Sequence, residues 1–333
     1  MLRTALCDLF GIDVPIVQAA MGIGSSAELA AAVSNAGGLG SVGCWRRSRE
    51  DVARQLDVLR DRTDRPFALN HLAPDHDEAA LALTLAARPP VMSFALGDPG
   101  DLVERAHAVG SLVMHQVTTV EQAVRAAEGG VDVIIAQGGE AGGFGGTVAS
   151  LPLVPQVVDA VHPLPVVAAG GIADGRGLAA ALVLGAVGVN MGTRFLASQE
   201  ARINIAWKEM ILEAAAEDAV KVDFLNEVMP VPGTGGYGTV LRTLRTAFVD
   251  RWQGRSEEAR QDAERLLAEV LPIMEQGRAH ELLPAAGQSA GLVHEILPAA
   301  EIIERVVADA RLALEQALRE PAAPADSLAR GSS

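Results

Sequence analysis

Polar side chains and glycines follow a series of short apolar segments in this chain, and their types could bind a cofactor or carry protons. They are Met21 and Gly22, Asn70 and His71, His115, Gln137 and Gly142, Gly170 and Gly171, and the run Asn190, Met191, Gly192 and Thr193. Amides can donate to and accept from an uncharged ring or a polyol, and glycines expose backbone N–H groups that can hold a phosphate. This combination suits a flavin carrying a ribityl phosphate. The two histidines could act as acid or base near neutral pH.

The densest cluster is residues 131–146, VDVIIAQGGEAGGFGG, in which an apolar run leads into six glycines. Such a cluster after a strand indicates tight turns or close approach of the backbone to a ligand. Phe144 is a bulky apolar ring at a place where a titratable group would be expected. A dinucleotide-binding turn is a weak alternative, because no acidic residue ends a strand about 20 residues later.

The elements that position these residues alternate regularly from residue 15 to about residue 198. Helix-period segments separate most of the apolar runs, which predict strands at Pro15–Met21, Gly38–Val42, Pro66–Leu72, Val91–Leu96, Leu112–Val117, Val131–Gln137, Val166–Ala169 and Gly188–Gly192. Alternating strands and helices indicate a parallel sheet, and eight units favour a closed (β/α)8 TIM barrel over an open sheet. In such a barrel the reactive face lies at the carboxyl ends of the strands.

The alternation stops after Phe195, which predicts a different second half. We expect the barrel in residues 1–198, a helical cap or substrate domain in 199–285, a C-terminal helix that completes or packs on the barrel in 286–318, and a disordered tail in 319–333. The cap is expected to hold helices at 201–216 and 255–276 with no strand between them. Tyr237, in the loop VPGTGGYGT, is a candidate lid residue.

Composition excludes several classes of partner. The formal charge of −15 disfavours nucleic acid and anionic membranes, and no apolar run has the length of a membrane span. Two cysteines, Cys7 and Cys44, are too few for a disulfide framework and are not spaced as metal ligands. We therefore expect a cytoplasmic enzyme, monomeric or homodimeric, that acts on a small molecule.

Four segments of the chain resemble the nitronate monooxygenase family, formerly called 2-nitropropane dioxygenases, which is related to flavin-dependent enoyl-ACP reductases. They are QAAMG, AQGGEAGGFGG, VVAAGGIADGRGLAAALVLGAVGVNMGTRFL and GQSAGL. The resemblance implies an FMN-binding barrel with a smaller domain over its active face. It implies that Met21 with Gly22 and Asn70 contact the ring or ribityl region, that Gln137 and Gly142 line the flavin, and that Gly170, Gly171 and residues 190–193 hold the phosphate.

Two positions depart from the family pattern. The family usually has histidine where this chain has Phe144, and proline where it has Ala20. Phenylalanine cannot transfer a proton, so proton transfer would fall to another residue. His115 and His71 are the candidates, since each is near the end of a predicted strand, and His115 alternates with Met114 and Gln116 in a direction that could lead into the cleft.

Three functions follow as alternatives from the resemblance. A nitronate is already a carbanion, so its oxidation by flavin and O2 needs no proton abstraction and survives the loss of the histidine. An NAD(P)H-dependent reductase of an activated C=C bond, such as that of an enoyl thioester, is the second alternative. A flavin-binding protein without catalysis is the third. Glu140 is expected to organise its loop, and Cys44 to be a buried residue near Trp45 in the pocket wall. For Arg194 two roles are open, an ion-pair partner or a ligand of an anionic substrate.

Overall fold

The computed structural model describes residues 2–229 and 239–318. Its centre is a sheet of eight parallel strands in the order β1-β9-β8-β6-β5-β4-β3-β2. The strands are β1 (Ile16–Gln18), β2 (Gly40–Gly43), β3 (Phe67–Leu72), β4 (Val91–Ala95), β5 (Leu112–Val117), β6 (Val133–Gln137), β8 (Val166–Ala169) and β9 (Gly188–Met191). A parallel bridge between Val17 and Leu39 joins β1 to β2. The eight predicted strands and the (β/α)8 barrel are confirmed.

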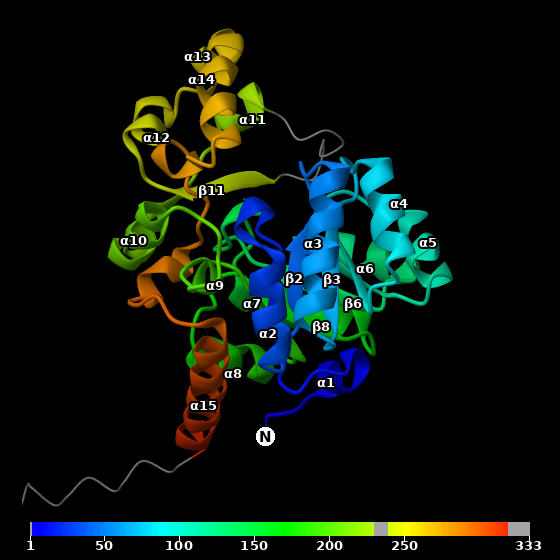
Figure 1. Ribbon diagram of the computed structural model, residues 1–333. Helices are drawn as coiled ribbons and strands as arrows, with labels where there is room; N and C mark the ends of the chain where they lie inside the picture. Colours follow the sequence, from blue (N-terminus) through cyan, green and yellow to red (C-terminus); the bar gives the residue numbers. More distant parts are fainter. Residues whose placement is uncertain (1, 230–238, 319–333) are drawn as a thin grey trace, which may run out of the picture.

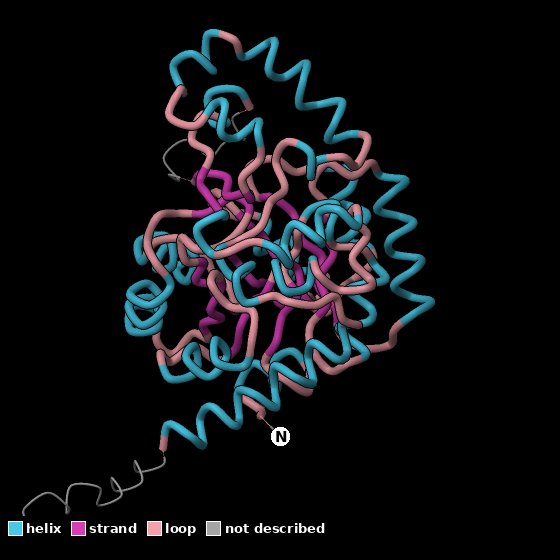
Figure 2. The backbone as a smooth tube through the Cα atoms, turned by 90° about the vertical axis from the view of Figure 1, so that its left-hand side faces the viewer, coloured by secondary structure: helices cyan, strands magenta, loops and turns pink. Residues whose placement is uncertain are grey.

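Helices surround the barrel strands (Figures 1 and 2). They are α2 (Ala27–Asn35), α3 (Arg49–Arg62), α4 (Glu78–Ala86), α5 (Leu102–Ala108), α6 (Val120–Glu128), α7 (Ser150–Val161), α8 (Gly175–Val183) and α15 (Ala299–Ala317). Several begin at a side chain that accepts from the first helical turn, such as Ser48 before α3 and Asp77 before α4. The helix α15 packs against α8 and α2, so the C-terminal segment supplies the last helix of the outer ring.

Two apolar layers lie on the two faces of the barrel strands. One layer lies between the strands and the helices and includes Leu69, Val113 and Val189. The other fills the inside of the barrel and includes Ala68, Met114 and Ile135. The short helix α1 (Ala5–Phe10) closes the amino end of the barrel by adding Leu6 and Phe10 to this inner layer. Side chains at the carboxyl ends of the strands are therefore left to form a site at the opposite end.

The second half differs from the prediction, and its part from α11 to α14 stands above the barrel in Figure 1. Its elements are α9 (Thr193–Leu196), α10 (Ile205–Glu213), β10 (Ala219–Lys221), α11 (Leu225–Val228), β11 (Val240–Leu244), α12 (Ala247–Trp252), α13 (Ser256–Gln261) and α14 (Ala263–Glu275). The expectation of helices without strands is wrong. The strands β10 and β11 form a sheet with β7 (Gly143–Gly145), which comes from the glycine cluster. The expected helix at 255–276 is divided at Asp262.

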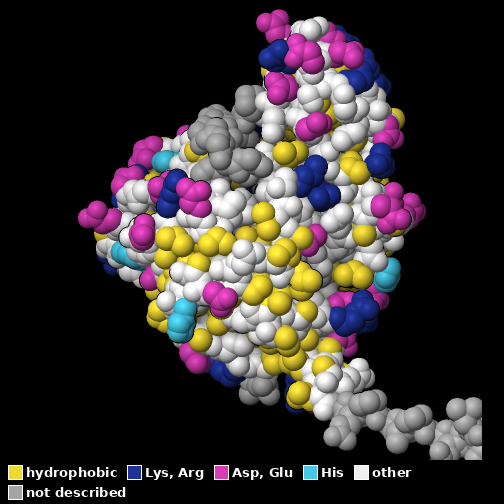
Figure 3. All heavy atoms as spheres, turned by 180° about the vertical axis from the view of Figure 1, so that it is seen from behind, with side chains coloured by type: hydrophobic (Ala, Val, Ile, Leu, Met, Phe, Trp, Pro, Cys, Tyr) yellow, Lys and Arg dark blue, Asp and Glu magenta, His cyan; other side chains and the backbone are white. Residues whose placement is uncertain are grey.

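Apolar side chains gather on the face opposite the view of Figure 1 (Figure 3). Large apolar side chains that are exposed include Leu151 at the start of α7 and Val183 at the end of α8.

Within residues 2–229 and 239–318, no helix has the length and apolarity needed to cross a bilayer. The predicted lid residue Tyr237 and the predicted disordered tail lie outside the described residues.

Candidate active site

Amides and a hydroxyl point inward at the carboxyl ends of the barrel strands. Asn70, Gln116 and Gln137 have the same alternation as the inner-layer residues Ala68, Met114 and Ile135. Asn70 Nδ2 donates to Ser93 Oγ at 3.1 Å, which links β3 to β4. The inward side chains of the barrel strands at this end include no ionisable group. The part of the barrel mouth that the strands supply is therefore polar but uncharged.

Two amides at the carboxyl ends of the strands, on β6 and β9, have buried acceptor atoms without a partner. Gln137 Oε1 and Asn190 Oδ1 are buried and accept no hydrogen bond. A buried acceptor without a partner costs about 1–3 kcal/mol, so a ligand that donates to both would recover this energy. The donors of a flavin ring and of a ribityl chain are of the required kind. The barrel mouth thus fits the predicted cofactor.

The turns after β1 and β8 bring bare backbone to the same end. Gly170 and Gly171 have φ of 94° and 73°, and Gly22 has φ of 55° with open space where a side chain would stand. Met21 lies beside Gly192, because a Cβ on Gly192 would be 3.5 Å from Met21 Sδ. Two side chains of the predicted phosphate segment are committed elsewhere: Met191 is buried in the outer layer, and Thr193 Oγ1 accepts from Gly287 N at 2.9 Å. Met191 can therefore serve a ligand only through its backbone, whereas the Thr193 hydroxyl keeps its own donor.

Most glycines of the 138–146 cluster are used for packing within the chain. A Cβ on Gly142 would lie 2.5 Å from the carbonyl carbon of Ala286, and one on Gly138 would overlap Ser150. Gly143, with φ of 73°, is the member of this cluster with open space around its Cβ position. The GQSAGL segment covers the side of Gly142 on which a Cβ would stand, and the expectation that Gly142 lines the ligand stays a prediction for the other side of its backbone. The density of glycine here reflects close packing of loops more than ligand approach.

Two cations of the cap hold this glycine loop in place. Arg242 on β11 is buried and donates from Nη2 to the carbonyl oxygen of Gly139 at 2.7 Å. Lys221 on β10 donates from Nζ to the carbonyl oxygens of Gly145, at 2.8 Å, and of Gly146. Burial, with the nearby Arg242 charge, lowers the pKa of Lys221 to about 8. Sequence reasoning missed both residues, because about 75 to 103 residues separate them from their partners.

Phe144 belongs to an apolar cluster at the barrel mouth. Its ring meets the edge of Trp45, with centroids 6.3 Å apart and planes at 83°. The same cluster contains Leu72 at the end of β3 and Leu96 after β4. Its cap neighbour is Leu241, which is its register partner on β11. The Phe144 ring is thus held by both the barrel and the cap.

His71 and His115 do not point into the mouth. His71 Nε2 lies 2.9 Å from Thr84 Oγ1 on α4, and His115 alternates with Val113 and Val117 of the outer layer. Alternation correctly separates His115 from Met114 and Gln116, but the expectation that His115 leads into the cleft is wrong. Burial lowers the pKa of each imidazole to about 4, so both are neutral near pH 7. Neither side chain can reach a substrate at the barrel mouth.

These histidines should make the fold sensitive to acid. Their pKa of about 4 in the folded chain lies below the ordinary value of 6.5, so the unfolded chain binds more protons between these pH values. Stability is therefore lost as the pH falls through this window. The free energy of unfolding should decrease from pH 7 to pH 4.5. We expect this decrease to be roughly 2 kcal/mol smaller in His115→Leu than in the unsubstituted chain. Urea unfolding of both proteins at both pH values measures the two decreases, and equal decreases would contradict the prediction.

Glu140 organises its loop, as predicted. Its carboxylate accepts from Ser150 N at 2.9 Å and from Ser150 Oγ at 3.0 Å, at the start of α7. Glu140→Ala should lower the free energy of unfolding by about 1–3 kcal/mol, because the Ser150 donors lose their partner. Ser150→Ala removes the hydroxyl bonds alone and should cost less. Urea unfolding compares the two variants, and an unchanged midpoint in Glu140→Ala would refute this role.

Two further candidates lie near the barrel strands. Arg194 is buried and donates from Nη2 to the carbonyl oxygens of Ala197 at 3.0 Å and of Glu295 at 2.6 Å, so this nitrogen has a structural role, whereas its buried Nε has no partner. Burial raises the pKa of the Cys44 thiol to about 12, which leaves it protonated and unreactive.

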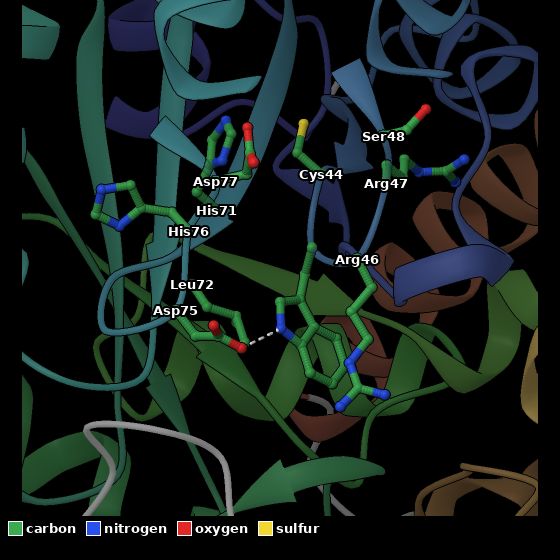
Figure 4. A pocket seen from close by; sticks show the side chains of 10 residues that line it. Cys44, Arg46, Arg47, Ser48, His71, Leu72, Asp75, His76 and Asp77 are labelled. Atoms are coloured by element: carbon green, nitrogen blue, oxygen red, sulfur yellow. Dashed lines mark hydrogen bonds between the residues drawn. The ribbon is translucent and has the colours of Figure 1, made fainter. Parts of the chain in front are cut away.

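A cavity of about 430 Å³ opens beside the mouth (Figure 4). One wall is the segment 44–48 that follows β2, and the other is formed by His71, Leu72 and residues 75–77. The expectation that Cys44 and Trp45 line a pocket is confirmed. Trp45 Nε1 donates to Asp75 Oδ2 at 2.8 Å, which joins the two walls.

The comparison with family models decides the identity. The model described as nitronate monooxygenase matches residues 3–88 and 77–309. The chain belongs to the nitronate monooxygenase family. The members of this family are flavin-dependent oxidoreductases, so the chain is a flavin-dependent oxidoreductase enzyme.

Individual relatives of this family member cover nearly its whole length. It is 32% identical to the 5-hydroxy-7a-methyl-1-oxo-octahydro-1H-indene-4-carboxyl-CoA dehydrogenase of Mycobacterium tuberculosis, over 95% of the chain and 98% of that protein. FabK from Thermotoga maritima is 35% identical with a TM-score of 0.86, covering 95% of the chain and 99% of FabK. A nitroalkane oxidase from Streptomyces ansochromogenes is 30% identical with a TM-score of 0.80, covering 95% of the chain and 100% of that structure.

Proposed function

We propose that this enzyme uses FMN to oxidise a carbon that reaches it already deprotonated, such as an alkyl nitronate, with O2 as the electron acceptor. The absence of charge among the inward side chains of the barrel strands is the observation that supports this function. Its inward side chains are amides and a hydroxyl, Phe144 stands beside it, and both nearby histidines face the helices. A substrate that needs no proton removed matches such a site.

The protein's own residues have binding roles in this proposal. Gln137 and Asn190, whose buried oxygens have no partner, would accept from the flavin, and Asn70 would contact it from β3. The turn at Gly170 and Gly171 and the backbone of residues 190–193 would hold the phosphate, with Met21 and Gly22 beside the ring. When bound, FMN would supply the acceptor of the substrate's electrons and the site of reoxidation by O2. The apolar cluster around Phe144 would exclude water from the reacting carbon.

The relative named as a carboxyl-CoA dehydrogenase supports a second candidate function. Its match extends over 95% of this chain, as does that of FabK. A CoA thioester with an activated carbon–carbon bond could therefore be the substrate, with NAD(P)H as the electron donor in the reductive direction. The apolar cluster could accept its acyl part.

Anaerobic reduction of the flavin distinguishes these functions. We expect the purified protein to bind FMN and the flavin to be bleached by an alkyl nitronate within one turnover, and to recover on addition of O2. Rapid bleaching by NADH or NADPH without a response to nitronate would overturn the first function and favour the thioester reductase. No bleaching by any donor would favour a flavin-binding protein without catalysis.

A further inference from the structure

The cavity between the β2–α3 and β3–α4 segments has one charged group with free donors. Arg47 is committed to Asp51 at 2.7 Å and to the carbonyl oxygens of Gly43 and Ser25. Among the described residues that line the cavity, the Arg46 guanidinium forms no hydrogen bond or ion pair and instead lies 4.6 Å from the centroid of the Trp45 ring. A guanidinium with its N–H groups free is suited to a carboxylate or a phosphate.

The backbone holds Arg46 in an unusual conformation. Its φ is 56°, in the left-handed region that non-glycine residues rarely adopt. Such strain persists where the surrounding structure requires it and is concentrated at ligand sites. Here the neighbouring indole is fixed by Asp75, and Arg47 anchors the next position. The strained turn therefore presents the guanidinium along a rigid aromatic surface.

The carboxylates of the cavity already have partners within the protein. Asp75 accepts from Trp45 Nε1, and Asp77 Oδ1 accepts from Ala80 N at the start of α4 at 2.7 Å. Figure 4 shows the residues after β2 and those after β3 on opposite sides of the cavity, with Arg46 and Asp75 apart on the two sides of the indole. An anion bound at Arg46 would thus meet the guanidinium before either carboxylate.

An apolar path joins this cavity to the barrel mouth. Trp45 and Leu72 line the cavity and also belong to the cluster that contains Phe144. Asn70, which faces the mouth, precedes His71 and Leu72 of the cavity wall. A substrate could therefore place its reacting carbon at the mouth, its apolar part along this cluster, and a charged end at Arg46.

We propose that Arg46 and its cavity bind an anionic group, a carboxylate or a phosphate, at the far end of an apolar substrate. This assignment rests on the proposed function, because it extends the same site to the remote part of the substrate. It makes Arg46 a specificity residue and leaves the chemistry at the mouth unchanged.

The test compares substrates with and without the anion on the FMN-loaded enzyme. The probes are the nitronates of 1-nitrobutane and of 4-nitrobutanoate, with butyryl-CoA as a phosphate-bearing ligand whose Kd is measured by calorimetry. Arg46→Gly removes the guanidinium and relaxes the left-handed backbone, so it should fold. Arg49→Gln is the matched control, since Arg49 is exposed nearby and does not line the cavity.

We expect Arg46→Gly to weaken the binding of one anionic probe about tenfold. It should leave kcat/KM for the 1-nitrobutane nitronate within about twofold, and Arg49→Gln should change neither. A loss confined to 4-nitrobutanoate assigns the site to a carboxylate, and a loss confined to butyryl-CoA assigns it to a phosphate. Unchanged binding of both anions, with normal turnover of 1-nitrobutane nitronate, would overturn the Arg46 site while the proposed function stands. Arg46-dependent binding of butyryl-CoA without turnover of any nitronate would keep the site and overturn the nitronate function.

Discussion

Gly170→Ala is expected to weaken FMN binding on the order of 100-fold. Gly170 has φ of 94°, and a Cβ there would lie 2.9 Å from the carbonyl oxygen of Gly138 and 3.2 Å from Ala141 N. The methyl group would combine backbone strain with a clash against the β6 loop. The turn assigned to the phosphate and the β6 loop must then move apart. The visible spectrum of the purified protein and an FMN titration measure the loss.

Gly254→Ala is the matched control for Gly170→Ala. Gly254 also has positive φ, 74°, but nothing lies within 4 Å of its Cβ position, so this variant carries the strain without the clash. It should keep FMN affinity within about twofold, because it is in the cap and not at the barrel mouth. If Gly170→Ala fails to fold, Gly171→Ala is the milder variant, since the nearest atoms to its Cβ would be Glu140 carbons at 3.6 Å and beyond. Undiminished FMN affinity in a folded Gly170→Ala protein would contradict the assignment of this turn.

Phe144→His should give the enzyme activity on neutral nitroalkanes, with a gain in kcat/KM of about 100-fold. Phe144 is held beside the mouth by Trp45, Leu72 and Leu241, so an imidazole there would stand where a base can reach the substrate. The activity should rise as the pH increases through the pKa of the new histidine, because only the neutral ring accepts a proton. Turnover of the nitronate should change by no more than a few-fold. Steady-state rates with 1-nitrobutane and with its nitronate, as a function of pH, measure both effects.

Phe144→Leu separates the gain of a base from the loss of the ring. It removes the edge contact with Trp45 without adding a titratable group. We expect it to show no gain in activity on the neutral nitroalkane over the unsubstituted enzyme. Equal activity of the histidine and leucine variants on that substrate would show that a proton acceptor at residue 144 is not what limits the reaction.

Much of the fold was accessible from local patterns. The eight barrel strands were predicted because each is a short apolar run bounded by turns, and α15 was expected because its helical period is long. The placement of Asn70, Gln137 and Asn190 at strand ends also predicted the amides of the mouth. The strands, α15 and the amides at strand ends each depend on residues that are close together in the sequence. The residues of one element and its turn are therefore enough to predict them.

The direction of the two histidines could not be predicted in this way. Strands of a parallel barrel are apolar on both faces, so alternation separates His115 from Met114 without telling which side faces the helices. The contact with Thr84 on α4 shows that His71 lies on the helix side of its strand, and the outer-layer neighbours Val113 and Val117 show the same for His115. The sheet of β7, β10 and β11 was missed for a related reason, since its pairing joins segments about 100 residues apart.

The sequence by itself determined the barrel, the family and an uncharged set of amides suited to a flavin, because strand period, turn glycines and strand-end residues are local properties. The tertiary structure decided what the glycine cluster does: Arg242 and Lys221 hold its carbonyls, and the GQSAGL segment packs on Gly142. It also decided that Phe144 joins an apolar wall with Trp45, and that Arg46 lies free beside it. These contacts depend on how distant loops meet at the end of the barrel, and no local pattern encodes that meeting.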